Sequence, residues 1–371
     1  MLDVFAVAEL LVSHALREHG DEIDIIGYYG SYARGTAREG SDLDIFYIPR
    51  DGADPPIART FSISGILFDF WAIRWETMEG FATGRIRGWA FAPAIVHHAK
   101  VLHARSEEHR DRLAELKQRV ADLQKPEARP QMIRRALEAF ARVLASLGNL
   151  RLACADREFT DVRHAGWQVI KSVLECLALA NRTFFDRGLR DSLGQLDRLR
   201  DRPADMEPLI DSIATSSDPS CILDACEQLA LGTRGILRKL QDSLPAEATP
   251  REQFHQAYPE LKDTLRGLLA ACEKQGPVAA SAEAWRLQSE LSSMLAQTER
   301  GAGDSAFNLY SELSSVYRQL DLPDLMQFSP EQSEALASQA KLLDEKLRQW
   351  LREHAIGLQE FGSVEQFRRS L

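Results

Sequence analysis

The stretch that most constrains the fold of this chain is Ile23–Ile48, which reads IDIIGYYGSYARGTAREGSDLDIFYI. It begins with a short run up to Tyr29 that is rich in β-branched and aromatic residues, which predicts a buried strand. Gly30-Ser31 interrupts this run, and a glycine allows the backbone to turn sharply and to approach a phosphate group closely. A polar loop follows, and the apolar Leu43–Ile48 then predicts a second strand.

Two aspartates stand at the start of the second predicted strand. Successive strand side chains point to opposite faces of a sheet, so Asp42 and Asp44 point to the same face. A pair of carboxylates there provides hard oxygen ligands, which suit a Mg²⁺ ion that also holds substrate phosphates. Either fragment alone is weak evidence, because a lone Gly-Ser is usually a turn and a lone D-x-D is often a solvated strand end.

The two fragments in this order are far more specific. Gly30-Ser31-Tyr32-Ala33-Arg34-Gly35 followed by Ser41-Asp42-Leu43-Asp44 resembles the signature of the DNA polymerase β-type nucleotidyltransferase superfamily. The antibiotic nucleotidyltransferases of the kanamycin, streptomycin and lincosamide kind, and the minimal nucleotidyltransferases, are the most similar branches. This resemblance extends to about residue 105. It implies transfer of a nucleoside monophosphate, AMP from ATP or another nucleoside triphosphate, to a hydroxyl group of an acceptor.

The family pattern also requires a third carboxylate on a later strand. Asp69 lies in the middle of the apolar run Gly65–Ile73, where an unpaired buried charge would be costly. Meeting the metal site of Asp42 and Asp44 would remove that cost, because a bound cation would compensate the charge. The resemblance therefore implies that Asp69 completes a two-metal Mg²⁺ site or takes the proton from the attacking hydroxyl.

The resemblance assigns two sets of site residues. The residues expected to be catalytic and to bind the metal are Asp42, Asp44 and Asp69. The residues expected to bind the nucleotide, chiefly through its phosphates, are Gly30, Ser31, Arg34 and Ser41.

Helical periodicity dominates the chain after Ser106. The most apolar segment, His164–Phe185, predicts the central helix of a bundle, and the whole pattern resembles the four-helix substrate domain of kanamycin-type enzymes. That family uses a glutamate early in the bundle as general base, and Glu138, Glu158 and Asp161 are all available. Each of these three could equally be a solvated charge on a helix surface.

Two other patterns allow alternative interpretations. Arg157 and His164 loosely fit the Arg-x(4–6)-His spacing of HEPN ribonucleases, although such pairs are common by chance. Adjacent His97 and His98 lie in a segment that could be helix, strand or one of each. Neither conformation points both rings to one place, so a shared metal ion is not expected.

The resemblance, together with the helical periodicity after Ser106, implies an α+β protein: a small mixed-sheet nucleotidyltransferase core, an all-α bundle and further C-terminal helices. The expected domains are residues 1–105, the core; 106–243, the bundle that binds the acceptor; and 244–371, a helical domain without a recognised motif. The polar segment Gln241–Arg251 contains two prolines and is the best candidate for a linker. The last domain is expected to pack on the bundle or to form a homodimer.

Composition narrows the class of partner. A formal net charge of −10 disfavours a broad nucleic-acid-binding surface, which would need a basic face. The five cysteines are an odd number without a C-x-x-C pair, which favours free thiols in a reducing cytoplasm. The N-terminal segment lacks a basic signal-peptide region and instead predicts a core-facing helix with Val7, Leu10 and Leu11 on its apolar side. No apolar run approaches the length of about 20 residues that a membrane span needs, so we expect a soluble cytoplasmic protein.

The sequence leaves the acceptor open. A small hydroxylated cation such as an aminoglycoside is favoured, because a bundle beside the core makes a cleft and an acidic surface attracts cations. A protein acceptor, as for antitoxins of the minimal nucleotidyltransferase type, is the second hypothesis, with the C-terminal helices as its docking surface. An inactive nucleotide-binding module is disfavoured because all three carboxylates are present.

Overall fold

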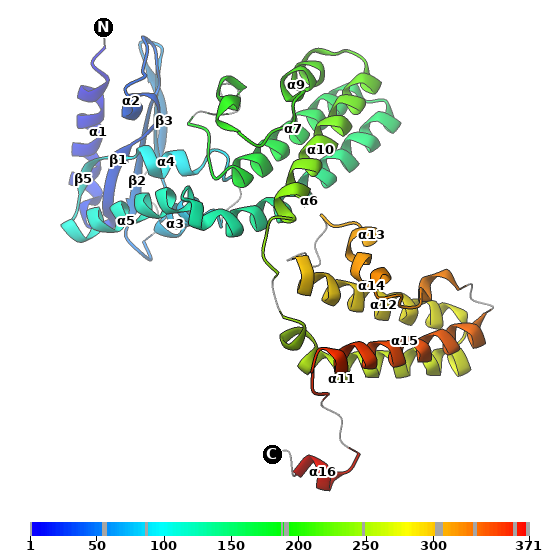
Figure 1. The fold of residues 1–371 in the computed structure, drawn as a ribbon. Helices are drawn as coiled ribbons and strands as arrows, with labels where there is room; N and C mark the ends of the chain where they lie inside the picture. The colour runs from blue at the N-terminus through cyan, green and yellow to red at the C-terminus, as the bar shows by residue number, and fades with distance from the viewer. Residues whose placement is uncertain are drawn as a thin grey trace. The chain divides into compact units, whose positions relative to one another are not determined.

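A five-stranded mixed sheet with the strand order β3-β4-β2-β1-β5 forms the N-terminal part of the chain (Figure 1). The computed structural model describes residues 2–53, 58–85, 88–186, 188, 193–246, 249–300, 307–328, 332–358 and 362–368. Strands β2 and β4 are parallel, and the other neighbouring strands are antiparallel. The strands are β1 (Ile23–Tyr28), β2 (Leu43–Pro49), β3 (Arg59–Ile63), β4 (Ile66–Ala72) and β5 (Lys100–Ala104).

Helices cover both faces of this sheet. Helix α1 (Val4–His19) packs on one face, where its partners on β2 are Leu43, Ile45 and Tyr47. The opposite face carries α3 (Trp75–Thr83), α4 (Pro93–His98) and α5 (Glu107–Leu123), packed against Phe46 and Ile48. Strand β2 is therefore buried on both sides, which explains why its sequence is continuously apolar after Asp44.

The N-terminal helix forms as expected, but one of its core residues was predicted wrongly. Asp3 caps α1 by accepting hydrogen bonds from the backbone N–H groups of Phe5 and Ala6. The buried residues of α1 are Val4, Ala8 and Ala15, whereas Leu10 is 72% exposed. The side of α1 that packs on the sheet therefore carries the small residues Ala8 and Ala15, and Leu10 lies on the exposed side of the helix.

The segment that could be helix or strand is one of each. Helix α4 ends at His98, and β5 begins two residues later at Lys100. The imidazole of His97 packs edge-on against Phe184, and His98 bonds to Asp186, so the two rings serve different contacts.

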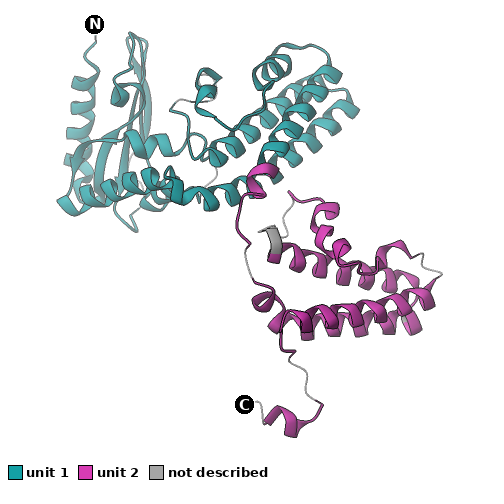
Figure 2. Ribbon diagram, in the orientation of Figure 1, with its two compact units in different colours: residues 1–237 teal, residues 238–371 magenta. Residues whose placement is uncertain are grey.

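The rest of the first compact unit, residues 1–237, is helical (Figure 2). Its helices are α2 (Gly30–Arg34), α6 (Arg129–Asp156), α7 (Phe159–Ala180), α9 (Met206–Thr215) and α10 (Pro219–Gln241), the last continuing into the second unit. Helix α7 is the most buried of them but ends at Ala180, whereas the sequence predicted helix as far as Phe185. Phe184 and Phe185 are buried in the loop that follows, so their apolar character reflects packing and not helix.

A buried glutamate joins the bundle to the core. Glu175 of α7 is 8% exposed, and its carboxylate accepts hydrogen bonds from the backbone N–H groups of Gly88, Trp89 and Ala90 at 3.2, 2.8 and 2.8 Å. Three donors satisfy a carboxylate that would otherwise be costly to bury. These bonds fix the segment that leads into α4.

Residues 238–371 form a second compact unit with its own apolar core (Figure 2). Its helices are α11 (Pro250–Ala270), α12 (Pro277–Arg300), α13 (Tyr310–Leu313), α14 (Ser315–Gln319), α15 (Ser333–Glu353) and α16 (Val364–Arg368). The predicted α+β fold class, a mixed-sheet core followed by helices, is confirmed. No helix in the described part of the chain is long and apolar enough to cross a membrane.

Candidate active site

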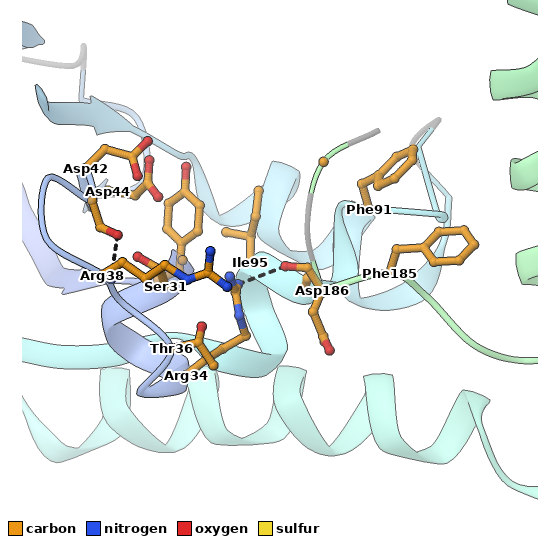
Figure 3. A pocket seen from close by; sticks show the side chains of 15 residues that line it. Ser31, Arg34, Thr36, Arg38, Asp42, Asp44, Phe91, Ile95, Phe185 and Asp186 are labelled. Carbon is orange, nitrogen blue, oxygen red and sulfur yellow. Dashed lines mark hydrogen bonds between the residues drawn. The ribbon is translucent and has the colours of Figure 1, made fainter. Parts of the chain in front are cut away.

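A cavity of about 480 Å³ opens where the ends of β1 and β2 meet α2, α4 and a loop of the bundle (Figure 3). Asp42 and Asp44 lie at one end of it, Phe91 and Phe185 at the other, and Arg34 and Asp186 between them. Its size falls in the range of about 300–1,000 Å³ that is usual for small-molecule sites.

The structure brings six of the seven predicted site residues to this cavity. The six that line it are Gly30, Ser31, Arg34, Ser41, Asp42 and Asp44. Asp69, the seventh, does not line it. It lies directly beside Asp44 in the parallel register of β2 and β4, and its Oδ1 accepts a hydrogen bond of 2.8 Å from Thr60 Oγ1.

Gly30 holds the tightest contact of the site. Its φ is +76°, a left-handed conformation that favours glycine, and a Cβ placed there would lie 2.3 Å from Asp44 Oδ2. No other residue allows both the turn and this approach. The glycine of the Gly-Ser pair therefore makes room for the carboxylate of the second motif, which explains why the two motifs work together.

The carboxylates influence one another electrostatically. Burial, the negative charge of Asp42 and that of Asp69 raise the pKa of Asp44 to about 6, against a smaller lowering by Arg34. Asp44 is thus a partly buried carboxylate among like charges. Such a group gains most from a cation, and its pKa is typical of functional sites.

Ser31 contributes a polar atom without a partner. Among the described residues, its Oγ is buried and makes no hydrogen bond, although a buried hydroxyl normally has a partner. A phosphate oxygen of a bound nucleotide would satisfy it. Ser41 has a different position, since its Oγ accepts a hydrogen bond of 2.8 Å from the backbone N–H of Arg38 and so closes the turn before Asp42.

The bundle supplies residues that the motifs did not reveal. Arg34 donates from Nη1 to the backbone oxygen of Asp186 at 2.8 Å, which attaches the bundle loop to α2. The Asp186 carboxylate lies 2.8 Å from His98 Nε2 and 2.5 Å from Arg198 Nη2. The hydrogen bond from His98, opposed by burial and assisted by Arg198, keeps the pKa of Asp186 well below its usual range.

None of the acids proposed as a general base in the bundle reaches the cavity. Glu138, Glu158 and Asp161 are exposed and do not line it. Arg157 and His164 are also exposed and outside it, with Arg157 ending α6 in a left-handed conformation at φ 59°. Among the described residues of the bundle, Asp186 is the acidic one that lines the cavity, and only its position in the fold reveals this.

The same residues suit a divalent cation by their chemistry. Asp42 and Asp44 are hard oxygen ligands on one face, and burial together with the neighbouring carboxylates raises the pKa of Asp44. Among the described residues, however, no three His, Cys, Asp or Glu side chains converge so as to hold a metal ion by themselves. A cation there would thus depend on Asp42 and Asp44 together with oxygen atoms of the substrate.

Comparisons with known proteins agree with this geometry. The family model described as Nucleotidyltransferase domain matches residues 12–75, and the one described as KNTase C-terminal domain matches residues 110–241. No curated protein matches the sequence. A nucleotidyltransferase-like protein from Exiguobacterium sibiricum 255-15 aligns over 68% of this chain and 87% of its own, at 14% identity and a TM-score of 0.37, which is too weak to inform the function.

Proposed function

Since the chain belongs to the kanamycin nucleotidyltransferase-like group of the DNA polymerase β-type superfamily, we propose that it transfers AMP from ATP to a hydroxyl group of a small molecule. The observation that carries this proposal is the contact between Gly30 and the Asp44 carboxylate, with the unpartnered Ser31 hydroxyl beside it. The family as a whole implies a nucleoside triphosphate donor and a divalent cation; ATP, Mg²⁺ and the acceptor are our proposals.

In this reaction the acceptor oxygen forms a bond to the α-phosphorus as the bond from that phosphorus to the pyrophosphate oxygen breaks. Pyrophosphate leaves with the electron pair, and the acceptor proton passes to a base. We assign that base to Asp69, which does not line the cavity itself but lies directly beside Asp44, and one of whose carboxylate oxygens accepts a hydrogen bond from Thr60. Asp42 and Asp44 would hold Mg²⁺, which when bound draws charge from the phosphates. Gly30, Ser31 and Arg34 bind the terminal phosphates, and Ser41 keeps the turn that carries Asp42.

A small acceptor is supported by the shape of the site. The cavity is bounded by core and bundle residues of one compact unit, and its end at Phe91 and Phe185 leaves space beyond the carboxylates. The formal net charge of −10 favours a cationic acceptor such as an aminoglycoside, because opposite charge raises the encounter rate.

The chemistry is tested by the release of pyrophosphate from ATP in the presence of Mg²⁺ and of a panel of aminoglycosides and lincosamides, whose hydroxyl groups supply the nucleophile. We expect Asp42→Asn and Asp44→Asn to abolish it while the fold is retained, as shown by circular dichroism and thermal unfolding. Asp21→Asn is a matched control, because its side chain is fully exposed and outside the cavity. Turnover at the wild-type rate in both site variants would contradict the assignment.

The acceptor is tested separately with labelled ATP and a panel of aminoglycosides and lincosamides. Labelled product from at least one member is the expected result. Release of pyrophosphate without product from any member would favour the second hypothesis, a protein acceptor that docks on residues 244–371. In that case, truncation after residue 243 should abolish transfer but preserve ATP binding.

A further inference from the structure

Tyr29 presents a hydroxyl group to the cavity from the end of β1. Its backbone N–H donates a hydrogen bond of 3.1 Å to the carbonyl oxygen of Asp44, and its side chain lines the cavity. The residue directly precedes Gly30 in the sequence. Its position relative to Asp44 is thus fixed by the main chain, and not only by side-chain packing.

Trp71 determines which way the phenol proton of Tyr29 points. The indole Nε1 of Trp71 lies 3.2 Å from the Tyr29 oxygen, and an indole N–H can only donate. The phenol oxygen is therefore the acceptor in this pair, and its own proton points elsewhere. In the described part of the chain, no backbone or side-chain atom accepts that proton.

Aromatic packing holds the Tyr29 ring against two residues of the neighbouring strands. The ring centroid of Tyr29 lies 6.2 Å from that of Phe46 and 6.4 Å from that of Trp71. Phe46 follows Asp44 by two residues on β2, and Trp71 follows Asp69 by two residues on β4, so all four side chains share one face. A tyrosine phenol has an ordinary pKa of about 10, so a tyrosine at this position offers a neutral donor at neutral pH.

A neutral donor at this position has a specific use in nucleotidyl transfer. Negative charge grows on the phosphoryl group during transfer, and the carboxylates beside it cannot stabilise that charge. Oriented donors aimed at the oxygens where charge develops are the usual means of doing so. Ser31 and Arg34 belong to α2, where the terminal phosphates are expected, whereas the backbone of Tyr29 is hydrogen-bonded to Asp44 on β2.

Building on the proposed function, we propose that the Tyr29 hydroxyl donates a hydrogen bond to a non-bridging oxygen of the α-phosphoryl group during its transfer. Trp71 is then a positioning residue, because its indole N–H orients the phenol without touching the substrate.

The first test is Tyr29→Phe, which removes only the hydroxyl and keeps the ring packing. At saturating ATP and Mg²⁺, we expect the rate of pyrophosphate release to fall on the order of 100-fold, as for loss of one oriented donor. The dissociation constant for ATP should change by less than about 3-fold, since the bond strengthens in the transition state. Tyr28→Phe is the matched control, because Tyr28 faces α1, packs on Phe5 and does not line the cavity.

The second test uses the two diastereomers of ATP with sulfur in place of a non-bridging α-oxygen. Sulfur accepts hydrogen bonds poorly, so for one diastereomer Tyr29→Phe should lower the rate only a few-fold relative to the wild type. With ATP itself, Tyr29→Phe should lower the rate by the whole expected factor, on the order of 100-fold. An equal loss with ATP and with both diastereomers would refute the contact, whatever the structural effect of the substitution. Should Tyr29→Phe fail to fold, Trp71→Phe is tested in its place. We then expect a smaller loss of rate with ATP, and again a weaker loss with one of the two sulfur-substituted diastereomers.

Failure of this inference can be told apart from failure of the proposed function. If the wild-type protein and Tyr28→Phe release pyrophosphate and Tyr29→Phe does so at the same rate, only the role of Tyr29 is wrong. A loss confined to ATP affinity, with an unchanged rate at saturation, would also refute it. If no form of the protein releases pyrophosphate from any nucleoside triphosphate, both proposals are wrong.

Discussion

Replacing Gly30 by alanine should lower the rate of nucleotidyl transfer far more than it lowers the stability of the fold. Ordinary contact begins at 3.4 Å, whereas the new Cβ would lie 2.3 Å from Asp44 Oδ2, so the carboxylate must withdraw by about 1.1 Å. A displacement of about 1 Å at a reacting centre can reduce a rate by about 100-fold. The positive φ of +76° adds a backbone cost of about 1–2 kcal/mol for an alanine.

Gly35→Ala provides the matched control. Gly35 has a φ of +71°, almost the same as Gly30, but a Cβ there would meet nothing within 4 Å. Both variants should therefore lose about 1–2 kcal/mol of unfolding free energy, or about 2–8 °C in Tm for a unit of this size. Only Gly30→Ala should lose pyrophosphate release, measured at saturating ATP. An equal rate in the two variants would refute the argument that Gly30 exists to admit Asp44.

Three further predictions concern the scaffold. Glu175→Ala should lower the free energy of unfolding, measured by urea titration, by about 3–5 kcal/mol, because three backbone donors lose their charged acceptor. The control Glu138→Ala, on the surface, should change this free energy by less than about 0.5 kcal/mol. Asp186 has a lowered pKa in the folded state, so its contribution to stability is complete above the usual aspartate pKa of about 4 and is lost below it. Between pH 5 and pH 3 the wild type should thus lose more stability than Asp186→Asn, and parallel urea midpoints would contradict this. Limited proteolysis with subtilisin should cut first within 241–251, between α10 and α11, and leave an N-terminal fragment that binds ATP; a first cut elsewhere would argue against that boundary.

The fold of the core could be predicted because its signals are local. The run before Gly30 and the run after Asp44 form strands, as their β-branched and aromatic residues indicated. The signature also located the cavity, because Gly30 and Asp44 meet only when both strands pair in this register. The confirmed family assignment follows from the same short stretch.

Contributions from distant segments could not be predicted. Asp186 lies six residues after the end of α7. Nothing in its local sequence indicates that it lies beside Arg34, which is 152 residues away along the chain. Tyr29 looked like the last apolar residue of a strand, and its hydrogen bond with Trp71 depends on the neighbouring positions of β1, β2 and β4. Likewise, the exposure of Leu10 depends on how closely α1 approaches the sheet, which periodicity does not specify.

The pairing of Asp44 with Asp69 has an evolutionary consequence. Two like charges directly opposite each other on neighbouring strands oppose folding, so selection for stability alone would replace one of them. The presence of both aspartates in this sequence is therefore what selection for activity would produce. A relative that had lost the chemistry would be expected to carry a neutral residue at one of these positions and to be more stable for it, as happens when a site is released from its function. Asparagine at position 44 or 69 would mark such a lineage, even where Gly30 and Ser31 remain.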